Sequence, residues 1–167
     1  LFNEVGKTVS SVTVGYKIIQ PQVGWAEQNP EDWWQATKNG IIDVINKSGV
    51  NSKDIESIGL TGQMHGLVLL NSKGEVLRDA IIWCDQRTDN ECKELTNQFG
   101  LKKLSCITGN PAMTGFTLSK LMWIKKNEPD VYRKIDKLLL PKDYIRYKLT
   151  GVFATEVSDA SGTQMLD

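Results

Sequence analysis

The chain has 167 residues, 40% of them hydrophobic and 24% charged, which suits one folded domain of ordinary globular composition. Its 20 basic and 20 acidic side chains cancel, so the charge pattern argues against nucleic acid or a membrane surface as partner. No apolar run approaches the roughly 20 residues of a membrane span. The three cysteines are odd in number and lack CxxC spacing, which argues against a metal site or a disulfide framework and fits a reducing cytoplasm.

The first part of the chain predicts strand, turn, strand and then a long helix. It opens on what resembles the end of a strand followed by a glycine-containing turn, and residues 9–19 continue as a second strand. Asn29 then offers a side-chain cap, and Pro30 suits the first helical position. Apolar residues recur at helical spacing from there to Gly49, which ends the predicted helix.

Two further predicted strands, 55–60 and 67–70, flank a turn that holds the only histidine of the chain, His65. Their apolar residues indicate a half-buried sheet. Glycines on both sides of Met64 and His65 relax the backbone and let another molecule come close. In α/β folds the end of a strand usually holds the ligand. A hairpin turn whose histidine points into solvent fits the same residues.

The second half of the chain continues the alternation of helix and strand, which favours an α/β layer architecture. Residues 80–83 form an apolar strand that breaks into a polar run. The remaining predicted elements are helices at 88–99, 118–127, 129–135 and 141–150 and a buried strand at 138–140. Connections are short and without repeats, so residues 1–167 are interpreted as one domain.

Several segments resemble the FGGY family of carbohydrate kinases. Residues 115–127, GFTLSKLMWIKKN, are similar to the family's signature. Gln63-Met64-His65-Gly66 is similar to the form carried at the sugar site by the members that act on D-xylulose, whereas glycerol kinases of this family place an Arg-Glu pair at Met64 and His65. Further matches lie at residues 24–34, 139–144 and 158–163, so the resemblance covers nearly the whole chain in the family's order.

The resemblance implies an actin-like, ribonuclease H-like α/β fold with a mixed sheet flanked by helices. It implies transfer of the γ-phosphoryl group of ATP, with Mg²⁺, to D-xylulose, giving D-xylulose 5-phosphate. It further implies that residues 1–167 are part of the N-terminal sugar-binding domain, truncated at both ends. The family's first hairpin, with a phosphate loop, would precede the chain, and the second domain, with the catalytic aspartate, would follow it. We therefore expect no catalytic residue and no metal ligand in this chain, and no activity from it alone.

Met64 and His65 are the residues predicted to contact the sugar. A neutral imidazole offers one donor and one acceptor, which suits neighbouring hydroxyl groups. Met64 would add backbone or apolar contact, although filling the core explains a methionine almost as well. The further candidates for the cleft are Gln63, Trp25, Asp85 and Asp159.

Some charged residues have structural alternatives. Asp85 and Arg87 could face the cleft, but an ion pair or cap is favoured because Arg87 lies in the first turn of a predicted helix. Asp159 lies in a small-residue loop, where a cleft or hinge position and the capping of a turn are equally good accounts. Lys120 is predicted to position or stack rather than bind phosphate, because it shares a helix face with Trp123.

Two interpretations compete with a D-xylulose kinase. One is a kinase of the same family for another sugar or sugar acid. The other is a non-catalytic sugar-binding module that uses the same fold, which fold alone does not exclude. The sequence leaves the oligomeric state open, a homodimer included.

Overall fold

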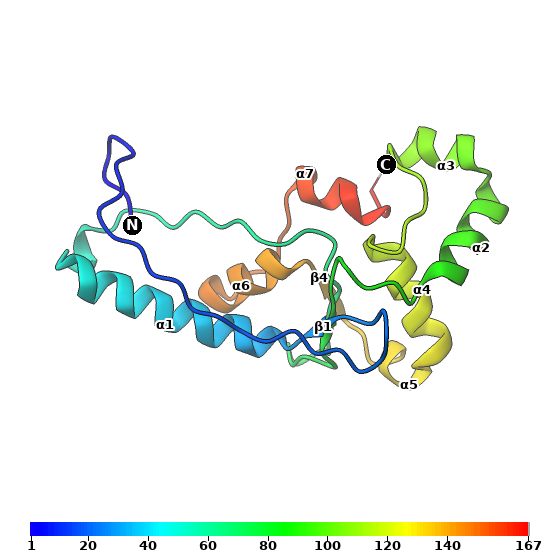
Figure 1. The fold of residues 1–167 in the computed structure, drawn as a ribbon, viewed down its shortest axis with the longest axis horizontal. Coiled ribbons are helices and arrows are strands. Elements are labelled where there is room, and N and C mark those ends of the chain that lie inside the picture. The colour runs from blue at the N-terminus through cyan, green and yellow to red at the C-terminus, as the bar shows by residue number, and fades with distance from the viewer. Residues whose placement is uncertain (167) are drawn as a thin grey trace.

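The computed structural model describes residues 1–166, and Figure 1 shows its elements around a small central group of strands. In chain order they are β1 (Glu27–Gln28), α1 (Pro30–Ser48), η1 (Ser52–Asp54), β2 (Val68–Leu70), β3 (Ala80–Ile81), α2 (Asp89–Phe99), α3 (Leu101–Thr108), α4 (Thr117–Asn127), α5 (Pro129–Tyr132), β4 (Lys137–Leu139), α6 (Pro141–Thr150), α7 (Val157–Ala160) and η2 (Ser161–Thr163).

The strands form two short antiparallel pairs, β1 with β3 and β2 with β4. An isolated antiparallel bridge between Leu67 and Ile81 connects the two pairs. In Figure 1, α1 and α6 lie on one side of these strands, and α2, α4 and α5 lie on the other. The strands therefore form the middle layer between two groups of helices, the arrangement expected of an α/β protein.

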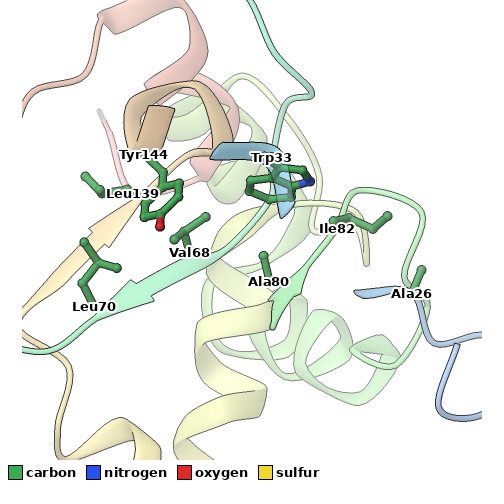
Figure 2. Close-up of a cluster of buried hydrophobic side chains, with 8 residues drawn as sticks. All are labelled: Ala26, Trp33, Val68, Leu70, Ala80, Ile82, Leu139 and Tyr144. Atoms are coloured by element: carbon green, nitrogen blue, oxygen red, sulfur yellow. The ribbon is translucent and has the colours of Figure 1, made fainter. Parts of the chain in front are cut away.

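The central strands are buried on both faces. One cluster of buried side chains contains Ala26, Trp33, Val68, Leu70, Ala80, Ile82, Leu139 and Tyr144 (Figure 2). The other contains Leu67, Leu69, Ile81 and Ile124. Because successive residues of a strand point to opposite faces, the run 67–70 supplies both clusters. The prediction of a half-buried sheet is therefore wrong for this segment, since helices cover both of its faces.

The predicted long helix is confirmed as α1. The Asn29 side chain accepts a hydrogen bond from the backbone N–H of Glu31 at 2.9 Å, and Pro30 occupies the first helical position. Gly49 ends the helix in the left-handed conformation, with φ of 69°. These signals are local, so the sequence alone located both ends.

The strands predicted at residues 9–19 and 55–60 are wrong. Residues 9–19 run extended apart from one bridge, between Ile19 and Glu27, and residues 55–60 form no ladder within the described chain. Residues 56–62 are also exposed. A strand requires a hydrogen-bonded neighbour, and neither segment has one along its length among residues 1–166.

Smaller differences concern the helices. The predicted helices at 88–99, 118–127 and 141–150 are confirmed as α2, α4 and α6, and β4 begins one residue before the predicted strand. The helix predicted at 129–135 ends at Tyr132. Helix α3 was not predicted, because Gly100 was interpreted only as a stop, whereas it lies between two helices. The loop predicted around Asp159 contains the short helices α7 and η2, and its cap is Glu156, whose carboxylate accepts from the Ser158 and Asp159 N–H groups.

Candidate functional site

The glycine-flanked turn that carries His65 has a constrained backbone. His65 has φ of 65°, in the left-handed region that few residues other than glycine adopt. A Cβ atom at Gly66 would lie 2.5 Å from Pro141 Cγ, so only glycine fits against the start of α6. The carbonyl oxygen of His65 accepts hydrogen bonds from Lys120 Nζ at 2.8 Å and from Thr117 Oγ1 at 3.2 Å. Side chains of helix α4 therefore hold this turn by its main-chain carbonyl oxygen.

Two neighbours orient the imidazole of His65. Its Nδ1 lies 2.9 Å from the carbonyl oxygen of Gly162, and the ring packs edge-on against Phe116 with centroids 4.6 Å apart. Because a carbonyl oxygen can only accept, Nδ1 carries the proton, and Nε2 of the neutral ring is an acceptor. Burial lowers the pKa of His65 below its ordinary value, against the opposing effect of the Gly162 hydrogen bond, so the ring is neutral at pH 7.

Asp159 lies near this ring and is paired with a lysine. Its Oδ2 lies 2.8 Å from Lys142 Nζ, which also lies 3.0 Å from Asp143 Oδ1. Burial opposes the charge on Lys142, but the hydrogen bonds to the two carboxylates outweigh it and raise the pKa of the lysine. The second carboxylate oxygen of Asp159, Oδ1, is buried and has no hydrogen-bond partner in the described part of the chain. A ligand hydroxyl would satisfy such an atom.

The neighbours of His65 in the turn point in different directions. Met64 is 58% exposed, so it is available for contact with another molecule. Gln63 donates from Nε2 to Gln28 Oε1 at 2.7 Å, and the same oxygen accepts from Trp33 Nε1 at 3.1 Å. Gln63 is therefore tied to β1 and α1, away from the imidazole.

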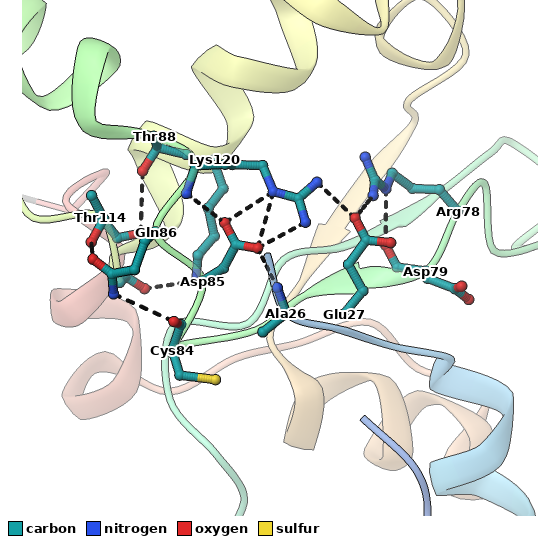
Figure 3. A network of polar contacts seen from close by, with 12 residues as sticks. Ala26, Glu27, Arg78, Asp79, Cys84, Asp85, Gln86, Thr88, Thr114 and Lys120 are labelled. Atoms are coloured by element: carbon teal, nitrogen blue, oxygen red, sulfur yellow. Dashed lines mark hydrogen bonds and ion pairs between the residues drawn. The ribbon is translucent and has the colours of Figure 1, made fainter. Parts of the chain in front are cut away.

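Asp85 and Trp25 belong to a second cluster, centred on Arg87. Asp85 is fully buried, and its Oδ2 accepts from the backbone N–H of Ala26 at 2.6 Å (Figure 3). Arg87 donates to the same carboxylate from Nε and Nη2, at 2.9 and 2.8 Å. The Arg87 guanidinium lies 3.7 Å from the Trp25 ring centroid and 4.9 Å from that of Trp123. This geometry matches the ion-pair alternative for Asp85 and Arg87.

Glu27 links the Arg87 cluster to β1. Its Oε1 lies 2.7 Å from Arg87 Nη1 and also pairs with Arg78 (Figure 3). Arg78 in turn reaches Glu128 at 2.5 Å, at the end of α4. Burial and the nearby Glu27 carboxylate raise the pKa of Asp79. The charged groups of this cluster pair with one another. The cluster therefore supports the loops around the site and does not present a free charge.

Sequence reasoning missed the residues that reach His65 from distant segments. Gly162 and Phe116, which contact the ring, and Lys142, which pairs with Asp159, all lie in segments that matched the family, but no role was assigned to them. The only signal in the sequence was that both segments contain glycine, and nothing in the sequence shows that these segments meet. A Cβ atom at Gly162 would lie 2.7 Å from His65 Cε1, which explains a glycine there.

Residues 1–167 match the description "FGGY family of carbohydrate kinases, N-terminal domain". The chain belongs to this family. Among its FGGY relatives, the xylulose kinase of Bacillus subtilis (strain 168) is 46% identical over 166 residues, which are 99% of this chain and 33% of that protein. The chain thus spans about a third of the length of the curated relatives it matches.

Solved structures of FGGY kinases share the fold. The ligand-bound xylulose kinase of Lactobacillus acidophilus superposes with a TM-score of 0.92 at 31% identity, over 99% of this chain and 33% of that one. A gluconate kinase structure from the same organism gives the same values. The expected actin-like α/β fold is thereby confirmed.

The described residues show neither a metal cluster nor a membrane span. Among residues 1–166, no three His, Cys, Asp or Glu side chains gather where they could hold a metal ion. In the same residues, no helix is long and apolar enough to cross a bilayer.

Proposed function

We propose that the protein containing this chain transfers the γ-phosphoryl group of ATP to a hydroxyl of D-xylulose, giving D-xylulose 5-phosphate. Residues 1–167 belong to its N-terminal domain and supply the sugar-side wall of the cleft. Relatives named xylulose kinase, 46% and 43% identical, support the substrate. The chain alone lacks a catalytic base and is expected to be inactive.

The observation that carries the proposal is the orientation of His65. With Nδ1 donating to Gly162, the neutral ring has one acceptor, Nε2, for a sugar hydroxyl. Asp159 Oδ1, buried and unpartnered in the described chain, is a second acceptor close by, and exposed Met64 adds apolar contact. Acceptors built to pair with hydroxyl groups discriminate against sugars that lack them.

The charges near His65 favour a neutral sugar over a sugar acid. A carboxylate substrate, such as the one named for the gluconate kinase neighbour, needs a cation. Lys120 is buried against two carbonyl oxygens, and Lys142 is paired with Asp143 and Asp159. Both lysines are thus engaged, which leaves D-xylulose as the better match and a sugar acid as the second candidate.

ATP use follows from membership of a kinase family, and Mg²⁺ is its usual companion in phosphoryl transfer. We propose that both bind mainly to parts of the protein outside this chain. A non-catalytic sugar-binding module would share the fold and the sugar contacts but not the reaction. We also propose a cytoplasmic location, which the free cysteines Cys84, Cys92 and Cys106 support.

The test is His65→Ala in the full-length protein. We expect the KM for D-xylulose to rise about tenfold or more, because hydroxyl partners worth about 0.5–1.5 kcal/mol each are lost. The KM for ATP should stay within about twofold. His65→Asn is the matched control for the backbone, because asparagine also tolerates a left-handed conformation.

Acidic pH gives a second readout of the same contact. Protonation turns Nε2 from acceptor to donor, so the KM for D-xylulose of the wild type should rise as the pH falls through the lowered pKa of His65. The rise should be absent from His65→Ala. An unaltered KM in His65→Ala would show that the ring does not contact the sugar, and a full-length protein without sugar-dependent ATP consumption would support the non-catalytic module.

A further inference from the structure

Lys120, on α4, is an ammonium group with no exposure to solvent. Its residue is 0% exposed, and Nζ donates to the carbonyl oxygens of His65 at 2.8 Å and Gly115 at 2.6 Å. Burying a charge is costly unless it is hydrogen-bonded, so this lysine would be replaced by an apolar residue if it only filled space. Burial lowers the pKa of Lys120 to about 7, partly offset by the Asp85 carboxylate.

The two carbonyl groups belong to segments far apart in the sequence. One is in the turn that carries His65, and the other is in the loop that leads into α4. Gly115 itself is packed closely, because a Cβ atom there would lie 2.9 Å from the Trp83 carbonyl oxygen. Lys120 therefore joins the His65 turn to the loop that leads into α4, which lies close against the Trp83 backbone.

Thr117, one turn earlier on α4, adds a second donor to the same oxygen. Its Oγ1 lies 3.2 Å from the His65 carbonyl, and the residue is also fully buried. Phe116, which precedes it, packs against the imidazole itself. Phe116, Thr117 and Lys120, all at the start of α4, thus fix the positions of the His65 carbonyl group and of its ring.

We propose that Lys120 is a positioning residue for the sugar site, whose side chain holds the His65 carbonyl and so fixes where the imidazole presents Nε2. This role rests on the proposed contact between His65 and the sugar. Lys120 does not bind phosphate directly, since it is fully buried and its hydrogen bonds go to two carbonyl oxygens. A neutral amine still has two N–H groups for these two acceptors, so both hydrogen bonds form whether or not Lys120 is charged.

The experiment compares Lys120→Met with Lys125→Met in the full-length kinase. Methionine is unbranched like lysine, fills most of the same space and has no donors. Lys125 is an exposed lysine of the same helix, and its loss should leave the activity unchanged. Backbone hydrogen exchange of residues 65–67, where the Leu67 N–H donates to the Ile81 carbonyl oxygen at 3.0 Å, is measured with the KM values for D-xylulose and ATP. In Lys120→Met, we expect faster exchange in that segment and a rise of about tenfold in the KM for D-xylulose alone.

Each result bears on the role of Lys120. Unchanged exchange in residues 65–67 overturns it, whichever sugar the enzyme takes. Faster exchange with an unchanged KM for the sugar overturns it as well, because the lysine is then only structural. If the wild type ignores D-xylulose but phosphorylates another sugar, the proposed substrate fails, and the same comparison with that sugar tests Lys120.

A second variant covers the case in which Lys120→Met does not fold. Thr117→Val removes one donor from the His65 carbonyl and keeps both the shape of the side chain and Lys120. We expect a smaller rise in the KM for D-xylulose, about threefold, with a small increase in exchange of the same segment. If the Thr117→Val enzyme equals the wild type in both measurements, the proposal that donors on α4 position the His65 turn is overturned.

Discussion

At the scale of single residues, His65 is held in a conformation that it would not adopt alone. A left-handed backbone costs a residue other than glycine roughly 1–2 kcal/mol. Two donors on its carbonyl oxygen and one acceptor on its ring, each worth about 0.5–1.5 kcal/mol, are together comparable to that cost or larger. The donors are Lys120 and Thr117, and the acceptor is Gly162. The surrounding structure therefore determines the direction of the ring.

Gly162→Ala should displace the imidazole. The added methyl would lie 2.7 Å from Cε1 and 3.1 Å from Nδ1 of His65, and Phe116 blocks retreat of the ring. We expect the KM for D-xylulose of the full-length protein to rise about fivefold or more, with the KM for ATP unchanged. Gly59→Ala is the matched control, because a Cβ atom there meets nothing within 4 Å. Equal KM values for the two variants would contradict the contact.

The sequence located His65 but not its partners. Its flanking glycines and the preceding apolar residues are close in the chain, so a local pattern reveals them. Gly162 lies 97 residues away, and Lys120 lies 55 residues away. Contacts of that kind depend on how α4 and η2 pack, which no local pattern encodes. For Lys120 the sequence indicated positioning, but not the group that it positions.

At the scale of elements, local sequence determines helices more completely than it determines strands. Helix α1 carries its own cap, its own proline start and its own glycine stop. The positions of β2 and β3 were also predictable from their apolar runs, although the burial of residues 67–70 on both faces was not. Residues 55–60 carry only interrupted apolar positions, Ile55, Ile58 and Leu60, and the segment forms no ladder among residues 1–166.

Asn29→Ala should weaken α1 by about 1 kcal/mol, because the N–H of Glu31 loses its acceptor at the positive end of a 19-residue helix. The measurement is the free energy of unfolding from urea titration. Asn51→Ala is the matched control, since Asn51 makes the same kind of cap on the three-residue helix η1, and we expect a smaller loss there. Equal losses of unfolding free energy in the two variants would show that the cap of α1 stabilises the fold no more than the cap of η1.

At the scale of the whole molecule, the 167-residue chain exposes apolar side chains on extended segments. Ile18 is 56% exposed and Ile58 is 60% exposed. A groove of about 300 Å³ over α1 is lined by Trp33, Gly40, Val12, Val14, Tyr16 and residues 60–63. Unpaired extended segments with apolar side chains invite pairing with another chain.

The isolated 167-residue chain should therefore self-associate or unfold more easily than the intact kinase. Light scattering at increasing concentration measures the association, and thermal melting measures the stability. Ile58→Lys should reduce association, because a charge on an exposed edge opposes pairing. Ile42→Lys is the control, since Ile42 is similarly exposed, at 56%, but lies on α1. A clean monomer that melts with the full enzyme would contradict this expectation.

The hold on the His65 turn has a consequence for how such enzymes change substrate over evolution. Lys120 and Thr117 grip a main-chain oxygen, which every amino acid possesses. A gene can therefore exchange the side chains at positions 64 and 65 without dismantling the turn that displays them. The backbone angle of 65° sets one restriction, since it disfavours β-branched replacements. On the proposed sugar contact of Met64 and His65, substitutions at these two positions change substrate preference while α4 stays as it is.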